Sequence, residues 1–257
     1  MKHPLRTLLL AVCCGLAAAC TQRQERLKLM SYNIRNGIGI DNIQDIGRIA
    51  RVILREAPDL VALQELDSAT LRVDGRYIPG ELGRMTGMHA TFGRAIGFAG
   101  GSYGVGLLSR TEPLAVRSTP LPGREEARVL LMAEFPDYTV CITHLSLTPE
   151  DRLASLPIIR EATDTCRKPV LLAGDFNTGN AAAVLAGLGG GFRILSDTTR
   201  MTFPSDNPAV RIDYILGRGL PTSATVAESA VDHTATASDH CPLWVTLVWK
   251  RGKQPGK

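Results

Sequence analysis

The sequence predicts a single layered α/β domain on three observations. Short apolar runs typical of buried strands recur along the 257 residues, at Lys28–Tyr32, Asp59–Leu63, Thr139–Thr143 and Val170–Ala173. Stretches with helical periodicity lie between them, so that strands and helices alternate as in layered α/β folds. Hydrophobic residues make up 44% of the chain, which can build a substantial core, and one domain is the simplest count for this length.

Two parts of the chain repeat one pattern. After Asn33, apolar residues recur at helical spacing before the strand that ends at Glu65; they are Ile43, Ile46, Ile49, Ile53 and Leu54. After His144, Thr148-Pro149-Glu150-Asp151 forms a good helix start, and Leu153, Leu156 and Ile159 follow it before the strand that ends at Asp175. Asn33 and Glu65 are 32 residues apart, and His144 and Asp175 are 31 apart. The spacing fits two β-α-β halves, and ordinary α/β alternation explains it equally well.

A glycine-rich segment separates these halves. Gly97–Gly106 holds five glycines between strand-like His89–Ile96 and Val105–Ser109. The pattern predicts a flexible hairpin at the rim of a site. It is not a Walker phosphate loop, because the required Lys-Ser/Thr pair is missing.

Polar side chains follow the apolar runs where those runs end. Asn33, Glu65, His144 and Asp175 each stand at or just after such an end. Layered α/β folds place ligands and catalytic groups there, so we expect these side chains to meet in one site. Carboxylate and amide oxygens suit Mg²⁺, and histidines can move protons or contact a phosphate.

Five motifs in a fixed order make this pattern specific. They are Ser31-Tyr32-Asn33, Leu63-Gln64-Glu65, Ile142-Thr143-His144, Gly174-Asp175-Phe176-Asn177, and Arg211-Ile212-Asp213-Tyr214 paired with Ser238-Asp239-His240. Together they resemble the endonuclease/exonuclease/phosphatase superfamily, which includes DNases, abasic-site endonucleases, neutral sphingomyelinases and inositol-polyphosphate phosphatases. The resemblance runs from residue 27 to about residue 247. It implies a four-layer sandwich of two packed β-sheets flanked by helices, and a metal-dependent phosphoric ester hydrolase. We separately expect a monomer.

The resemblance also implies which residues hold the metal and the substrate. Glu65 is the expected Mg²⁺ ligand, with Asn33 beside it and Asp239 completing or water-bridging the coordination; Mn²⁺ is a possible substitute. Tyr103 resembles a substrate-facing tyrosine of some relatives, and a structural role is its equal alternative. Arg128 stands where relatives often carry an arginine that contacts phosphate.

Five further residues are expected to carry the chemistry; they are His240, Asp213, Asp175, Asn177 and His144. His240, oriented by Asp213, would act on the scissile phosphate as an acid–base or charge-stabilising group. Asp175 would orient or deprotonate the attacking water. Asn177 would donate to a phosphate oxygen, and His144 would supply a second imidazole. The sequence leaves open whether Asp175 or His240 takes the proton.

The first residues have the features of a signal peptide over 1–19, with Lys2 and Arg6 followed by apolar Thr7–Ala19. Cys20 resembles the lipid-accepting cysteine of bacterial lipoproteins, which predicts an exported protein anchored to the cell envelope through a linker over residues 20–26. Ala17 stands where such signals usually carry leucine, so cleavage that leaves a soluble exported protein is the alternative. The catalytic domain is then expected over 27–249 and a basic disordered tail over 250–257.

The charge balance helps to choose among substrates. Removing Lys2 and Arg6 from the 29 basic residues leaves 27 against 25 acidic ones, and four of the 27 lie in residues 250–257, so the body holds 23 against 25. Dedicated duplex-DNA binders normally show a concentrated basic face, which such a body does not supply. Arg35 and His144 also replace residue types typical of abasic-site endonucleases.

We therefore expect an envelope-tethered phosphodiesterase that acts on a phospholipid-like or sugar-linked phosphodiester. The Thr202-Phe203-Pro204 turn before Arg211-Ile212-Asp213-Tyr214 most resembles proteins that remodel GPI anchors and their small bacterial relatives. The alternatives are an extracellular nuclease and a catalytically inactive binding module on the same fold.

Three cysteines follow the anchor region, namely Cys141, Cys166 and Cys241. No two of them have the spacing of a zinc site. We expect buried thiols, with one disulfide as the alternative.

Overall fold

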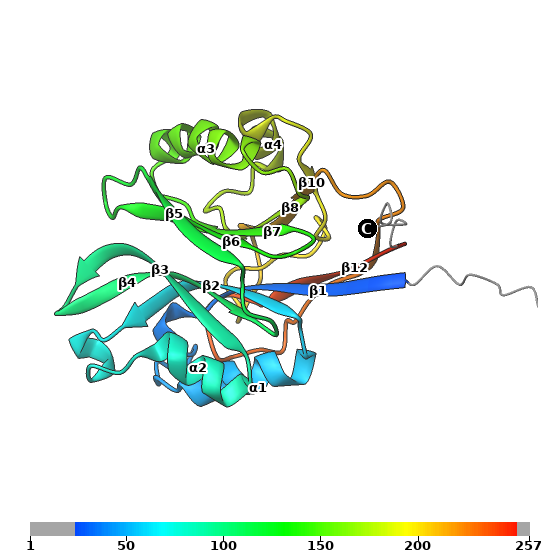
Figure 1. Cartoon of the computed structure of the whole chain (residues 1–257). Helices are drawn as coiled ribbons and strands as arrows, with labels where there is room; N and C mark the ends of the chain where they lie inside the picture. The colour runs from blue at the N-terminus through cyan, green and yellow to red at the C-terminus, as the bar shows by residue number, and fades with distance from the viewer. Residues whose placement is uncertain (1–23, 251–257) are drawn as a thin grey trace, which may run out of the picture.

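The computed structural model describes residues 24–250 and folds them into four layers (Figure 1). The first sheet contains β1 (Gln24–Asn33), β2 (Leu60–Ser68), β3 (His89–Phe98), β4 (Gly101–Ser109), β11 (Thr225–Val231) and β12 (Leu243–Lys250). The second contains β5 (Ala115–Leu121), β6 (Arg128–Glu134), β7 (Thr139–His144), β8 (Val170–Asp175), β9 (Arg193–Ile194) and β10 (Asp213–Arg218). The helices are α1 (Ile46–Glu56), α2 (Ile78–Thr86), α3 (Pro149–Asp164) and α4 (Ala181–Leu188), with short 3₁₀ turns at Arg35–Gly37 and Leu71–Val73.

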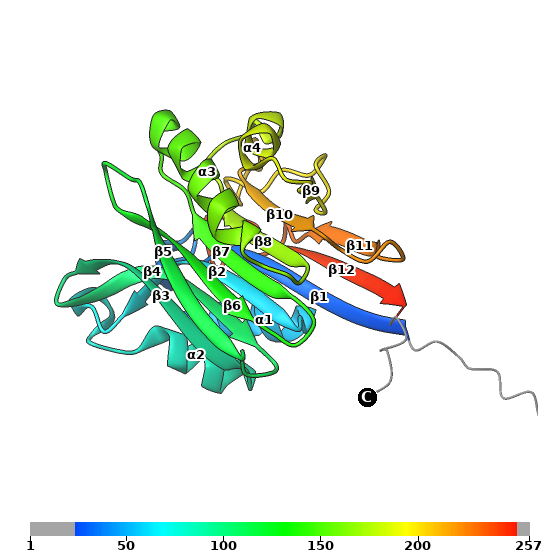
Figure 2. The same ribbon diagram turned by 45° about the horizontal axis from the view of Figure 1, so that its top comes forward.

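The two sheets pack face to face, and helices cover their outer faces. The strand orders are β11-β12-β1-β2-β4-β3 and β5-β6-β7-β8-β10-β9. Helices α1 and α2 lie against the first sheet, and α3 and α4 lie against the second, as Figures 1 and 2 both show. This arrangement confirms the predicted four-layer α/β sandwich.

Each sheet contains one parallel β-α-β unit at its centre. Strands β1 and β2 pair in parallel around α1, and β7 and β8 pair in parallel around α3. An antiparallel strand then adds to each unit, β12 on β1 and β10 on β8. The near-equal spacing in the sequence therefore reflects two equivalent units, one in each sheet.

Helix α1 shows how the apolar pattern is used. Asp45 caps the helix by accepting a hydrogen bond from the amide two residues later, at 2.7 Å. Ile49 and Ile53 are buried in the cluster beneath the first sheet, as the pattern predicts. Ile43 and Leu54, which the same pattern included, are 60% and 53% exposed. Ile43 precedes the helix, and Leu54 follows the last core position onto the solvent side.

The layer between the sheets is apolar except at one end. Leu29 of β1, Leu131 of β6 and Ile142 of β7 are fully buried in this cluster. Further along β1 and β2, on the same faces of the strands, Asn33 and Gln64 are also fully buried. The dry core therefore gives way to polar groups where β1, β7 and β8 end.

Strand β2 does not end at Glu65, contrary to the prediction. It continues to Ser68, and its register against β4 shifts between Leu63 and Leu66. Glu65 lies in this bulge with a left-handed φ of 55°. A bulge breaks the alternation of side chains and can re-aim one of them, which turns the Glu65 carboxylate toward the strand ends.

The glycine-rich segment forms the predicted hairpin, between β3 and β4. Its turn is short, at Ala99 and Gly100, and most of its glycines lie inside β4. A Cβ at Gly104 would lie 2.1 Å from the carbonyl oxygen of Gly93. The glycines therefore allow close strand approach as well as a turn.

The sheet extends beyond the predicted domain limits at both ends. Gln24 begins β1 and pairs with Lys250 of β12, so residues 24–26 and 250 belong to the sheet instead of a linker and a tail. The signal peptide, Cys20 and the rest of the basic tail lie outside the described residues. In the described part of the chain, no helix is long and apolar enough to cross a membrane.

The three cysteines of the domain are free thiols in the described structure. Cys141 and Cys241 are buried, whereas Cys166 is partly exposed, so the expectation of buried thiols is wrong for Cys166. Burial raises the pKa of Cys241 to about 12, which keeps this thiol protonated near neutral pH.

Gly174, beside the strand-ending Asp175, is a position where a larger residue should be costly. A Cβ there would lie 2.0 Å from the carbonyl oxygen of Thr143 on the adjacent strand. We expect Gly174→Ala to destabilise the protein by about 1–3 kcal/mol, the usual range for overpacking, or more because backbone must move. Urea unfolding should show this loss. Gly179→Ala is the matched control, because its Cβ would meet Arg211 O at an ordinary 3.6 Å; equal stability of the two variants would contradict the prediction.

Candidate active site

The polar end of the inter-sheet layer collects the motif residues from both sheets. Asn33, His144 and Asp175 end β1, β7 and β8, as the sequence predicts. Asp213 instead begins β10, and His240 precedes β12. These two strands run antiparallel to their neighbours, so that Asp213 pairs with Asp175 in the β10–β8 register. Asp213 and His240 therefore reach the same edge from strand starts, whereas Asn33, His144 and Asp175 reach it from strand ends.

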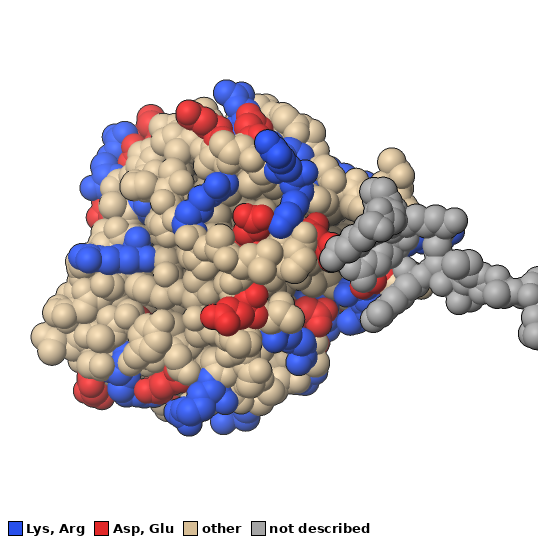
Figure 3. Space-filling view, viewed as in Figure 1, with Lys and Arg blue, Asp and Glu red and all other residues tan. Residues whose placement is uncertain are grey.

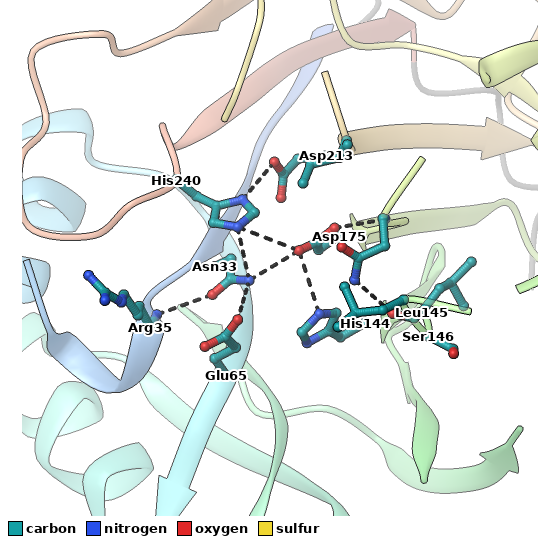
Figure 4. A network of polar contacts seen from close by, with 12 residues as sticks. Asn33, Arg35, Glu65, His144, Leu145, Ser146, Asp175, Asp213 and His240 are labelled. Carbon is teal, nitrogen blue, oxygen red and sulfur yellow. Dashed lines mark hydrogen bonds and ion pairs between the residues drawn. The ribbon is translucent and has the colours of Figure 1, made fainter. Parts of the chain in front are cut away.

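The side-chain amide of Asn33 lies at the centre of the site (Figure 4). Its Nδ2 donates to Glu65 Oε1 at 3.0 Å and to Asp175 Oδ2 at 3.1 Å, and it lies 3.4 Å from His240 Nε2. Its Oδ1 accepts from the amide of Arg35 at 3.1 Å. One side chain from the first sheet thus contacts the predicted metal ligand, the predicted water-orienting carboxylate and the predicted catalytic histidine.

Asp213 and His240 form a buried pair. His240 Nδ1 lies 3.0 Å from Asp213 Oδ2, which places a proton on Nδ1 and leaves Nε2 facing Asp175 Oδ2 at 3.7 Å. Burial alone would lower the pKa of His240, but the charge and hydrogen bond of Asp213, with Asp175, raise it to about 10. The imidazole is therefore cationic at neutral pH. The ring of Phe203 packs against it with centroids 4.8 Å apart.

Thr202 joins the two strand starts that supply this pair. Its hydroxyl accepts from the amides of Ile212 and Asp213 at 3.2 and 3.3 Å. Its carbonyl accepts from the amide of Cys241 at 2.8 Å. The sequence gives only a threonine two residues before a proline in a turn, and this signal does not identify the partners of Thr202.

Asp175 is held between the two imidazoles. Its Oδ1 accepts from the amide of Asn177 at 2.8 Å, and its Oδ2 lies 3.6 Å from His144 Nε2. Burial raises the pKa of Asp175, and the charge of Asp213 raises it further. The side chain of Asn177 donates to Leu145 O at 2.9 Å, so this nitrogen fixes the loop after β7 in the described structure. The predicted donation from Asn177 to phosphate therefore stays a prediction.

His144 and Arg128 meet on the other side of Asp175. Arg128 is only 6% exposed, and its Nη1 lies 3.3 Å from His144 Nδ1. Burial lowers the pKa of His144 to about 4. The charge of Arg128 also lowers this pKa, whereas the charge of Asp175 opposes the shift. The ring is therefore neutral near neutral pH. Tyr103 lines the same small hollow as Arg128 and His144.

The donor set around Glu65 fits a hard divalent cation. Burial raises the pKa of Glu65, although the hydrogen bond from Asn33 lowers it. The charges of Asp239 and Asp175 raise the pKa further. Asp239 is partly exposed, with Arg35 Nε 3.5 Å from its Oδ2. Clustered carboxylates are oxygen ligands that Mg²⁺ prefers, and a cation would relieve their mutual repulsion. The Asn33 amide would add its oxygen only after turning over, because its nitrogen faces Glu65 here.

A second group could also hold a metal by distance alone. Ligand atoms of Asp175, Asp213 and His240 all lie within 4.8 Å of one another. His240 and Asp213 Oδ2 already hydrogen-bond each other, however, and an imidazole is a softer ligand than Mg²⁺ usually takes. The Glu65 group is the better fit for a hard cation.

Arg72 supports the bulge and was not identified from the sequence. Its Nη2 donates to Asp67 Oδ1 at 3.0 Å and to Asn36 Oδ1 at 2.7 Å. Its guanidinium carbon lies over the rings of Phe98 and Tyr103, at 4.6 and 5.2 Å from their centroids. Arg72 thus ties the β3–β4 hairpin to the segments after β1 and β2. An arginine in a short loop carries no local signal for such long-range contacts.

Comparisons with known proteins support the fold and give the family. Among solved structures, an endonuclease/exonuclease/phosphatase family protein from Bacteroides thetaiotaomicron is similar with a TM-score of 0.72 and 20% identity, and the match covers 89% of this chain and 100% of that one. An endonuclease/exonuclease/phosphatase from Beutenbergia cavernae has a TM-score of 0.70 and 23% identity, and the match covers 88% of this chain and 72% of that one. A mannosyl-6-phosphatase from Bacteroides thetaiotaomicron gives 0.68 and 19%, covering 86% and 99%. These likenesses show the fold. Residues 30–240 match the endonuclease/exonuclease/phosphatase family, and the chain therefore belongs to that family.

Proposed function

We propose that this phosphoric ester hydrolase is a Mg²⁺-dependent phosphodiesterase that acts on a phospholipid-like or sugar-linked substrate at the cell envelope. The family implies ester hydrolysis at phosphorus with a divalent metal. The observation that carries the proposal is the convergence of Glu65, Asp175 and His240 on the amide of Asn33. An intact set of this kind argues against an inactive binding module.

The geometry suggests a division of roles. Glu65, Asn33 and Asp239 would hold the Mg²⁺, which when bound supplies positive charge to stabilise the phosphate oxygens. Asp175, whose pKa is raised, would orient the attacking water and take its proton as the oxygen bonds to phosphorus, while the ester P–O bond breaks and the leaving alcohol takes a proton from solvent. His240 would stabilise the charge that develops on the phosphate, because a pKa of about 10 keeps it cationic and makes it a poor base at neutral pH.

The charge on the face drawn in Figure 3 favours a substrate other than duplex DNA. Figure 3 shows Lys and Arg interspersed with Asp and Glu over the face that it presents, without a broad patch of one sign among the described residues there. Non-specific DNA binding draws most of its free energy from basic side chains that displace counterions. The resemblance of the Thr202-Phe203-Pro204 turn to proteins that remodel GPI anchors, and the fold likeness to a mannosyl-6-phosphatase, favour a sugar- or lipid-linked phosphate.

An activity screen with the purified protein tests this function. The substrates are bis-p-nitrophenyl phosphate, phospholipids, sugar phosphates and plasmid DNA, each with Mg²⁺ and with EDTA. We expect Mg²⁺-dependent hydrolysis of the diester and of a lipid or sugar substrate in preference to DNA. Faster cleavage of plasmid DNA, with steeply salt-dependent binding, would establish the nuclease alternative. If none of the substrates is hydrolysed, the catalytically inactive binding module is the remaining alternative.

The envelope location is a separate prediction that concerns Cys20. We expect Cys20→Ser to abolish lipidation and to move the protein from the membrane fraction to the soluble fraction, because the acyl chains are the proposed attachment. Fractionation and intact-mass measurement check this outcome. The matched control is Cys166→Ser, which alters a partly exposed thiol within the domain. Wild-type protein that is soluble and lacks acyl mass would support the alternative of a secreted protein. The proposed monomeric state can be checked in the same preparations by light scattering.

A further inference from the structure

The two active-site histidines face opposite kinds of neighbour through the same ring atom. His240 Nδ1 lies against a carboxylate, Asp213, at 3.0 Å. His144 Nδ1 lies against a guanidinium, Arg128, at 3.3 Å. A carboxylate accepts hydrogen bonds, whereas a guanidinium only donates them. The two rings are therefore held with opposite proton placement at Nδ1.

We propose that Arg128 is a positioning residue that fixes His144 as the neutral tautomer with its proton on Nε2. A nitrogen that faces only donors must act as an acceptor, so Nδ1 carries no proton. The single proton of the neutral ring then lies on Nε2. That atom faces an acceptor, Asp175 Oδ2, at 3.6 Å. Both ends of the ring favour the same tautomer.

Arg128 is itself fixed, and it has little freedom to bind a substrate. Its Nη1 also donates to Glu126 Oε1 at 2.9 Å, and its Nη2 donates to Glu125 Oε1 at 3.3 Å. Glu125 in turn accepts from Ser146 Oγ and from the amide of Leu147, both at 2.7 Å. The same carboxylate therefore holds the arginine and the loop that follows His144. With Arg128 only 6% exposed, a phosphate would have to displace this network to reach it.

The consequence rests on the proposed function. A neutral His144 with a proton on Nε2 can donate a hydrogen bond to a phosphoryl oxygen beside Asp175, but that nitrogen cannot accept a proton from water. His240, whose Nδ1 faces the carboxylate of Asp213, is held in the opposite way. The two histidines are then positioned for different roles, and His144 Nε2 is not the group that accepts the proton from water.

The test combines ring nitrogen NMR with kinetics on the full-length protein. In protein labelled with ¹⁵N-histidine, assigned with His144→Gln, the wild-type spectrum should show His144 with a bare Nδ1 and a protonated Nε2. Arg128→Met removes the donors and keeps the length of the side chain; it should redistribute the proton toward Nδ1. With bis-p-nitrophenyl phosphate, kcat should fall by about 10- to 100-fold, the range for partners that orient an active-site imidazole, with KM changed much less.

Two further variants separate positioning from stability. Arg128→Lys keeps a side chain that only donates, so it should restore the Nε2-protonated form and most of kcat. Arg124→Met is the matched control, because Arg124, in the loop before β6, pairs with Asp151 of α3 at 3.0 and 3.1 Å and is 62% exposed. That variant should leave the His144 signals and kcat as in the wild type.

Three results would overturn the inference. They are a wild-type His144 protonated on Nδ1, an unchanged tautomer in Arg128→Met, or a raised KM with an unchanged kcat in that variant, which would indicate direct substrate binding. The first needs no variant, so it can be read even if Arg128→Met fails to fold. If the protein hydrolyses none of the substrates while the tautomer responds as expected, the proposed function fails and the assignment of Arg128 stands.

Discussion

Replacing Glu65 by glutamine is expected to lower Mg²⁺-dependent hydrolysis by at least about a hundredfold, the scale of losing a metal's charge stabilisation in the transition state. The variant keeps the size of the side chain and an oxygen to pair with Asn33, but it removes the charge that a cation would balance. The bulge that presents residue 65 should remain. The loss should therefore appear in turnover and in the Mg²⁺ concentration needed for half-maximal rate, and much less in thermal stability.

The control for this variant is Glu81→Gln. Glu81 lies on α2 and hydrogen-bonds Arg76 at the surface, so the same chemical change there should leave hydrolysis at the wild-type rate. Turnover that is unchanged in Glu65→Gln, with the same Mg²⁺ requirement, would remove Glu65 from the metal site. The group formed by Asp175, Asp213 and His240 would then be the remaining candidate.

The Asp213–His240 pair should behave as one unit. Asp213→Asn removes the acceptor that holds His240 Nδ1, and His240→Ala removes the ring itself. We expect each change to cost at least about a hundredfold in kcat, since either one removes the same oriented cation. The double variant should be scarcely worse than the more damaging single variant, because residues that act together are not additive.

The loss of kcat in the double variant decides whether Asp213 and His240 act as one unit. Two independent hundredfold losses would multiply to about ten-thousandfold, or about 5.4 kcal/mol. His89→Ala is the control, because His89 is exposed at the start of β3, away from the dyad, and should leave kcat unchanged. Losses that multiply fully would show that Asp213 and His240 act separately, and the orienting role of Asp213 would be wrong.

Most of the fold could be predicted from the sequence because each central β-α-β unit is formed by residues that are close together in the chain. Each β-α-β unit is a contiguous segment of about the same length, with a strand pattern, a helix start and a proline before the next strand. Within such a unit, the strand-ending Asn33, His144 and Asp175 could be placed at one edge by the rule for parallel strands. The resemblance supplied the packing of two sheets, which periodicity alone does not show.

The remaining features depend on contacts between distant segments. The bulge at Glu65 appears only in the register between β2 and β4. Asp213 reaches the site because β10 is antiparallel to β8. The sequence of a six-residue strand does not show in which direction the strand runs in the sheet. The guanidinium of Arg128 could be expected at the site, but which atom it contacts is set by Glu125, Glu126 and the fold of the loop after β7. Side-chain partners of this kind follow from tertiary structure and not from spacing.

Strand β1 runs from the end of the domain where both chain termini leave the sheet to the end that holds the active site. Gln24 pairs with Lys250 at one end of this strand, and Asn33 lies at the other, about 30 Å away at the usual rise per strand residue. A bead, a sensor chip or a bilayer that holds the chain beyond either terminus of the sheet would therefore leave the catalytic end directed toward free solution. Immobilised protein should stay accessible to soluble substrates.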